Sequence, residues 1–216
     1  GFSIGVVYDG SEFVEKAIRN VIRDMITGTV LTALILFLFL QRMGATVAVA
    51  VAMPTAIIAT FIPMYLAGFT LNIMSTLGLA VSVGVLVNNS ILVLENIYRY
   101  RELGEGPESA AIKGTKEIAA SVLSTTATNL GVFIPVAFMG GMVGQMFREF
   151  ALTVVFSTLF SLWMAFTVTP MAAARLGSEG KPVSRTARFL TGWWQWLYGG
   201  LEDLHHLLLG RAMRHP

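Results

Sequence analysis

The chain has 216 residues, of which 55% are hydrophobic and only 13% charged, with a formal net charge of +2 and a mean hydropathy of +0.68. These values exclude a water-soluble domain and indicate an integral membrane chain. The absence of cysteine excludes disulfides and thiolate metal sites, and the three histidines all lie near the C-terminal end. We therefore expect no cofactor, no metal and no nucleic-acid partner.

The N-terminal segment differs from the apolar runs that follow it. Residues 2–8 are typical of a short strand, residues 9–11 of a turn with a helix cap, and the chain from Glu12 onward of a helix that enters the membrane. We interpret residues 1–24 as the end of an external α/β domain with its connecting helix. Because the chain begins at Gly1 without an initiator methionine, we expect it to be a piece of a longer protein.

Five apolar stretches follow, each near the roughly 17 to 25 residues that a helix needs to cross a bilayer. Continuous apolar runs of this length predict helices, whereas a transmembrane β-barrel would show short alternating segments. The fold class expected for residues 25–176 is therefore all-α, a bundle of five transmembrane helices. The predicted spans are residues 25–40, 45–67, 71–95, 118–139 and 150–173.

The segment after the last span, residues 177–216, has a different character. Residues 184–197 place two arginines beside a cluster of three tryptophans, a pattern typical of an amphipathic helix lying in the headgroup layer. The same aromatic cluster could instead pack on the ends of the spans. We interpret the segment as a cytoplasmic interfacial helix followed by the approach to a further span. The residues in question are Arg185, Arg188, Trp193, Trp194 and Trp196.

Basic residues lie directly after the first span, in the loop between the third and fourth spans, and after the fifth. Loops rich in lysine and arginine stay on the cytoplasmic side of a membrane, so these three segments are predicted to be cytoplasmic. The residues that carry this prediction are Arg42, Arg99, Arg101, Lys113, Lys116, Arg175, Lys181, Arg185 and Arg188.

Two adjacent asparagines, Asn88 and Asn89, lie near the middle of the third apolar run, where polar side chains are costly and usually functional. A buried carboxylate needs a cation or becomes neutral, whereas an asparagine needs only hydrogen-bond partners. We therefore expect polar groups on the same and neighbouring helices to hold the two amides. The candidates are Ser82 and Ser90 on the same helix, and Ser121, Ser124, Thr125, Thr128 and Asn129 on the fourth span.

Two interpretations of the fourth-span candidates remain open. Positions 121, 125, 128 and 129 share one helical face, which would form a polar seam toward the bundle interior. Alternatively, the hydroxyls bond back to carbonyls of their own helix. Glu95, near the cytoplasmic interface, is either a substitute proton carrier or a carboxylate satisfied by water.

Seven short motifs in a fixed order connect the chain to a known family. Together, from Phe13 to Gly177, they resemble the first membrane half of a resistance-nodulation-division (RND) transporter, most closely the hydrophobe and amphiphile efflux pumps. The second half of such a transporter remains an alternative match. The motifs are Phe-Val-Glu-Lys-Ala-Ile-Arg from Phe13, Phe-Leu-Phe-Leu-Gln from Phe37, Met53-Pro54, Gly-Phe-Thr-Leu-Asn from Gly68, Leu-Glu-Asn-Ile from Leu94, Phe-Ile-Pro-Val-Ala-Phe-Met-Gly-Gly from Phe133, and Thr169-Pro170.

The resemblance implies that the five spans are the second to sixth of a twelve-span transporter, and that the N-terminal remnant belongs to a periplasmic porter domain. It implies a multi-pass protein of the bacterial inner membrane that exports amphiphilic or hydrophobic compounds by alternating access. The implied partners are the second half of the same transporter, two further copies in a homotrimer, a periplasmic adaptor, an outer-membrane channel and membrane lipid.

The chain departs from this family at the asparagine pair. The resemblance implies acidic residues at positions 88 and 89, where protons are taken up and released, but an amide does not titrate at accessible pH. We expect ion coupling, to a proton or a sodium gradient, to be altered or supplied elsewhere. A non-transporting membrane scaffold or regulatory subunit is the alternative. An intramembrane enzyme would need a nucleophile and base or a metal set, which the sequence does not offer.

Overall fold

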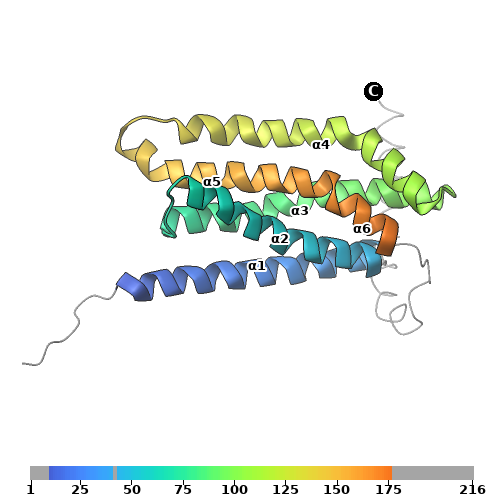
Figure 1. Cartoon of the computed structure of the whole chain (residues 1–216), viewed down its shortest axis with the longest axis horizontal. Coiled ribbons are helices and arrows are strands. Elements are labelled where there is room, and N and C mark those ends of the chain that lie inside the picture. Colours follow the sequence, from blue (N-terminus) through green and yellow to red (C-terminus); the bar gives the residue numbers. More distant parts are fainter. Residues whose placement is uncertain (1–9, 41–42, 177–216) are drawn as a thin grey trace, which may run out of the picture.

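The computed structural model describes residues 10–40 and 43–176, and every regular element within these ranges is a helix (Figure 1). The all-α prediction is confirmed for this part of the chain. The strand expected over residues 2–8 and the interfacial helix expected over 177–216 lie outside the described residues. The helices are α1 (Gly10–Leu40), α2 (Met43–Leu66), α3 (Ile73–Glu102), α4 (Pro107–Ala137), α5 (Gly141–Phe166) and α6 (Val168–Leu176).

Within the described ranges, five helical segments are long and apolar enough to cross a membrane, as predicted. Two of them begin earlier than expected, α4 at Pro107 instead of residue 118 and α5 at Gly141 instead of residue 150. Hydropathy marks only the part of a helix inside the hydrocarbon layer, so it misses turns that extend into the headgroup region. Helix α1 runs without a break through the predicted domain boundary at residue 24.

Helices α3 and α5 form the centre of the bundle, with α4 on one side and α1 on the other (Figure 1). The close approach of α3 and α5 depends on Gly78. A Cβ atom at this position would lie 2.8 Å from the carbonyl oxygen of Phe150 and 2.9 Å from the Cβ of Thr153. Small residues at such crossings are the usual way for membrane helices to pack tightly.

The start of α3 is set by its N-cap residue. The side chain of Asn72 accepts hydrogen bonds from the backbone N–H groups of Met74 and Ser75, and the Ser75 hydroxyl accepts one from the Asn72 N–H. This capping box satisfies orphan donors of the first turn. Asn72 also donates to the carboxylate of Glu149 on α5, so the start of α3 is attached to the helix it packs against.

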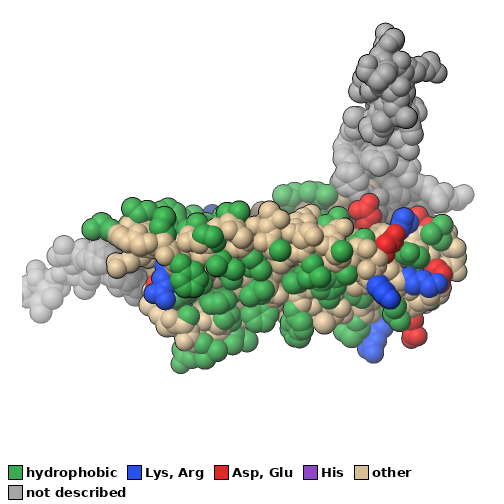
Figure 2. Space-filling view, turned by 90° about the horizontal axis from the view of Figure 1, so that it is seen from above, with side chains coloured by type: hydrophobic (Ala, Val, Ile, Leu, Met, Phe, Trp, Pro, Cys, Tyr) green, Lys and Arg blue, Asp and Glu red, His purple; other side chains and the backbone are tan. Residues whose placement is uncertain are grey.

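Helix α4 is the least covered of the five spans. Only 11% of its most apolar window is buried, compared with 50% for the segment that includes α5. Figure 2, which views the bundle from the α4 side, shows apolar side chains across its length and most of the charged ones gathered at one end. This distribution fits a helix whose outer face meets lipid or the remainder of a larger membrane domain.

Candidate functional site

Asn89 is buried between α3 and α4, with 1% of its surface exposed. Its Nδ2 atom donates a hydrogen bond to the hydroxyl oxygen of Thr126, at 3.3 Å. Thr126 was not among the predicted partners. Its position could have been found from the inner face of α4, where Gly114, Val122 and Thr126 recur at multiples of four residues and are all buried.

Asn88 lies on a different face of α3, because successive helical residues are about 100° apart. Its side chain is exposed on the described bundle, as is that of Glu95, seven residues later on the same face. Among the residues that the structure describes, neither side chain has a hydrogen-bond or ion-pair partner. The uncovered face of α3 therefore presents an amide and, two turns away, a carboxylate.

The two predicted partners on α3 itself bond elsewhere. The buried Ser82 hydroxyl donates to the carbonyl of Gly78 at 2.6 Å, one turn back on the same helix. Ser90, also buried, accepts a hydrogen bond from the hydroxyl of Thr169 at 3.4 Å. Ser90 thus joins α3 to α6 directly after the asparagine pair.

None of the predicted partners on α4 is fully buried. Ser121, Ser124 and Thr128 are exposed, while Thr125 and Asn129 are half-buried. The Thr125 hydroxyl donates to the carbonyl of Ser121 at 3.0 Å, and that of Thr128 to the carbonyl of Ser124 at 2.9 Å. These bonds correspond to the second interpretation given above, in which the hydroxyls are satisfied within their own helix.

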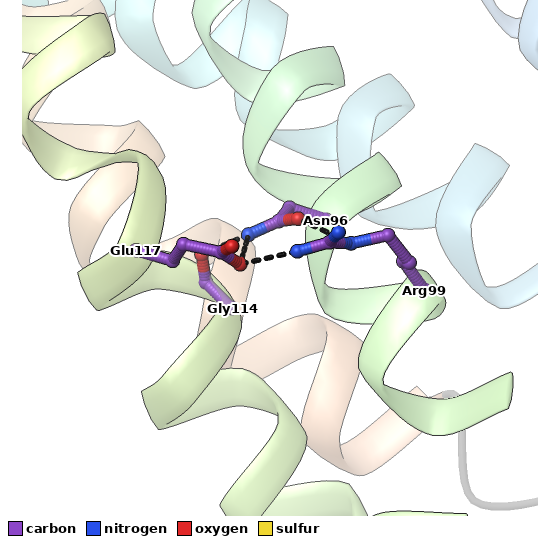
Figure 3. A network of polar contacts seen from close by, with 4 residues as sticks. All are labelled: Asn96, Arg99, Gly114 and Glu117. Atoms are coloured by element: carbon purple, nitrogen blue, oxygen red, sulfur yellow. Dashed lines mark hydrogen bonds and ion pairs between the residues drawn. The ribbon is translucent and has the colours of Figure 1, made fainter. Parts of the chain in front are cut away.

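A second polar cluster joins α3 and α4 seven residues beyond Asn89 (Figure 3). The Nδ2 of Asn96 donates to the carbonyl oxygen of Gly114 at 2.7 Å and to Oε2 of Glu117 at 2.9 Å. Its Oδ1 accepts from Nε of Arg99 at 3.0 Å, and Arg99 also forms an ion pair with Glu117. Every hydrogen-bonding atom of the Asn96 side chain is therefore used.

Gly114 allows this cluster to form. A Cβ atom there would lie 2.8 Å from the Cα and 2.9 Å from the N of Ile97, so the backbones of α3 and α4 are in direct contact. From the sequence, Asn96 was part of a family motif only, and the cluster was not predicted. The sequence pattern that could have indicated it is Gly114 three residues before Glu117 on one helix. Asn96 and Arg99, also three residues apart, lie on the preceding helix.

The turn between α3 and α4 lies outside the membrane-spanning segments. Helix α3 ends at Glu102 with Leu103 as its C-cap, and Gly104 follows in the left-handed region, at a φ of 92°, the usual glycine stop of a helix. The next residue, Glu105, accepts hydrogen bonds from Lys113 and from Ser109 on α4. The hydrogen bond from Lys113, followed by that from Ser109, lowers the pKa of the Glu105 carboxyl.

The side chains of the asparagine pair stay uncharged. An amide donates and accepts hydrogen bonds, and its oxygen can ligate a cation, but it does not exchange a proton at accessible pH. In the described ranges, no group of three or more histidine, cysteine or acidic side chains is placed to hold a metal ion.

The comparison with known families concerns the whole chain. Residues 1–216 match the family described as AcrB/AcrD/AcrF. The chain belongs to the AcrB/AcrD/AcrF family. Among similar proteins, multidrug resistance protein MdtC of Photorhabdus laumondii is 41% identical over 177 residues, which is 82% of this chain. MdtC of Escherichia coli is 38% identical over 177 residues, and that of Pantoea ananatis 37% identical over 186 residues, or 86% of this chain.

Membership of the AcrB/AcrD/AcrF family confirms the RND resemblance inferred from the seven motifs. Together with the five apolar helices, it also confirms a multi-pass membrane protein. The chain spans only 17% of the length of the Photorhabdus and Escherichia relatives and 18% of that of Pantoea. The asparagine pair and the Asn96 cluster thus belong to one AcrB/AcrD/AcrF membrane segment.

Proposed function

We propose that this chain is part of the membrane domain of an efflux transporter that exports amphiphilic or hydrophobic compounds by alternating access. Its family membership, its five membrane-crossing helices and the printed name of its relatives, multidrug resistance protein, support the proposal. In this proposal the parent protein lies in the bacterial inner membrane as a homotrimer. It works with its own second half, a periplasmic adaptor and an outer-membrane channel.

The ion coupling of this transporter is proposed to differ from a simple proton relay at positions 88 and 89. The observation that carries this proposal is the neutral bond from buried Asn89 to Thr126. A hydroxyl can satisfy an amide, whereas a buried carboxylate would need a cation or would take up a proton. The gradient, of protons or of sodium, would then be coupled through another part of the protein or another protomer.

The test is efflux by the full-length parent in sealed vesicles under a proton gradient, a sodium gradient, or neither. Asn88→Asp and Asn89→Asp are compared with the parent, and Asn129→Asp serves as a control because Asn129 is a half-buried asparagine on α4, outside the pair at positions 88 and 89. Altered coupling predicts that a carboxylate at 88 or 89 changes the dependence on the proton gradient, while Asn129→Asp does not. Unchanged gradient dependence in both variants would contradict it.

A non-transporting membrane scaffold is the second candidate function, and the absence of a titratable group at positions 88 and 89 favours it. This alternative predicts no efflux of any tested compound under either gradient by the parent protein. It also predicts that disrupting the parent gene leaves the susceptibility of cells to amphiphilic compounds unchanged. Efflux driven by either gradient would rule it out.

A further inference from the structure

A groove with a volume of about 470 Å³ opens between α4 and α6 at the charged end of the bundle. Its walls are mainly apolar, formed by Ile112 and Ala119 on α4 and by Phe166, Pro170 and Met171 on the other side. Ile112 is 69% exposed and Met171 is 50% exposed. The volume falls within the roughly 300 to 1,000 Å³ of typical ligand sites.

The groove exists because the chain bends between α5 and α6. Helix α5 ends at Phe166, and Pro170 has no N–H with which to continue the ladder to the Phe166 carbonyl. Helix α6 therefore turns away from the line of α5 (Figure 1). The first turns of α4 face this bend with small side chains, Ala111, Thr115 and Ala119.

The groove crosses the predicted boundary between lipid tails and headgroups. The continuous apolar run of α4 begins at Ile118, so the Ala119 end of the groove lies in the hydrocarbon layer and the Glu108 end in the aqueous layer. Lys116 lies between these two ends. Side chains on a helix lean toward its N-terminus, so Lys116 extends toward the headgroup layer.

Lys116 differs from the other basic residues nearby. Lys113 is bound to Glu105, and Arg99 is bound to Glu117. Lys116 is exposed and has no ion-pair partner within the described ranges, and the same holds for Glu108 at the outer rim of the groove. The groove thus offers an apolar wall, then an available cation, then an available anion, in order from the membrane interior outward.

We propose that this groove binds a phospholipid with an amine headgroup, of the phosphatidylethanolamine type. One acyl chain lies along the apolar wall beside Ala119 and Phe166, the phosphate meets the ammonium of Lys116, and the headgroup amine meets the carboxylate of Glu108. From the membrane interior outward the lipid carries an anion and then a cation, which is complementary to the cation and then the anion of the groove. Lipid binding in this groove does not require that the parent protein transports.

The test measures lipid retained by the purified full-length protein, using native mass spectrometry during titration with phosphatidylethanolamine or phosphatidylglycerol. Lys116→Ala is expected to weaken phosphatidylethanolamine binding about fivefold, the factor for one lysine at a phosphate surface. Lys113→Ala, the matched control, should leave binding unchanged because that lysine is already paired with Glu105. Equal losses in the two variants would overturn the proposal.

The amine contact is tested separately with Glu108→Gln. The unaltered protein should retain phosphatidylethanolamine in preference to phosphatidylglycerol, and this substitution should remove the preference. Stronger retention of phosphatidylglycerol by the unaltered protein would refute the assignment. A benzophenone amino acid placed at Met171 identifies the occupant directly: a lipid adduct supports the proposal, and a cross-link to any protein segment contradicts it.

Discussion

The two polar contacts between α3 and α4 are built differently, although they are only seven residues apart on α3. At Asn89 a single neutral hydrogen bond joins an amide to Thr126, and no charged side chain takes part. At Asn96 an amide, a guanidinium, a carboxylate and a backbone carbonyl are joined in one cluster, with Arg99 and Glu117 about half exposed.

Depth in the membrane explains this difference. A charge is expensive in the middle of a bilayer, while near its surface water and headgroups solvate the exposed parts of an ion pair. The same two helices can therefore be held firmly at their charged ends and loosely in the middle. We expect the loose contact at Asn89 to permit relative movement of α3 and α4, with the Asn96 cluster as the fixed end.

The largest expected effect comes from Gly114→Ala. The added methyl would meet backbone atoms of Ile97 that cannot rotate away, so α3 and α4 must separate at the fixed end. We expect a loss of about 3 kcal/mol in the free energy of unfolding, the upper range for overpacking. Equilibrium unfolding of the full-length protein in mixed micelles measures it.

Gly131→Ala is the matched control on the same helix, because a Cβ atom at Gly131 would have no neighbour within 4 Å. It should be neutral or stabilising, since alanine is the better helix former by up to about 1 kcal/mol. Similar destabilisation by both substitutions would show that the backbone contact at Ile97 is not what matters.

Asn96→Ala should have the next largest effect. It removes the amide that connects Arg99, Glu117 and the Gly114 carbonyl, and the expected loss is about 2 kcal/mol, as for other buried hydrogen-bonding groups. Glu95→Ala, at the adjacent exposed position, should change stability by less than about 0.5 kcal/mol. The same unfolding assay compares the two variants, and equal losses would argue against the cluster as the fixed end.

The contact between Asn89 and Thr126 should be weaker. A double-mutant cycle with Asn89→Ala and Thr126→Val is expected to give a coupling energy of about 0.6 kcal/mol, the average for hydrogen bonds between membrane helices. The corresponding cycle with Asn96→Ala and Glu117→Ala should give a larger value. A coupling at Asn89 that equals or exceeds it would reverse the proposed order of the two contacts.

The smallest effect is expected at the aqueous turn, where pH tests the pairing of Glu105 with Lys113. Because the pKa of Glu105 is lowered from its ordinary value near 4.5, the pair contributes stability above that pH. The contribution should disappear as pH falls through the lower folded-state pKa. Unfolding between pH 6 and pH 3, compared with Glu105→Gln, measures it; identical pH dependence in the two proteins would exclude a role for this pair.

Several features could be predicted from the sequence because they follow from short-range physical chemistry. Continuous apolar runs near 20 residues long predicted five membrane helices, and the motif from Gly68 to Asn72 together with the others predicted the family. The first residues of α4 and α5 were predicted less well, because hydropathy does not report turns of helix outside the hydrocarbon layer.

The contacts between helices could not be predicted in the same way. Both Thr126 and Thr125 are hydroxyl residues on α4, and only the rotation of α4 against α3 decides that Thr126 meets Asn89. That rotation follows from the backbone contact at Gly114, which involves residues seventeen positions apart in sequence, Ile97 and Gly114. Pairings of this kind depend on the packed geometry of two helices.

Composition and local pattern alone determined that this protein is a helical membrane chain, approximately where its spans lie, and that amides occupy the middle of α3. These features could be predicted because a segment inside the hydrocarbon layer must be apolar over a fixed length. Only the tertiary structure decided which face of α3 meets α4, that Asn89 is buried while Asn88 is not, and that Asn96, Arg99 and Glu117 form one cluster. The physical reason is that a bilayer selects for apolar length, whereas the rotation of one helix against another is selected by close packing at a few small residues.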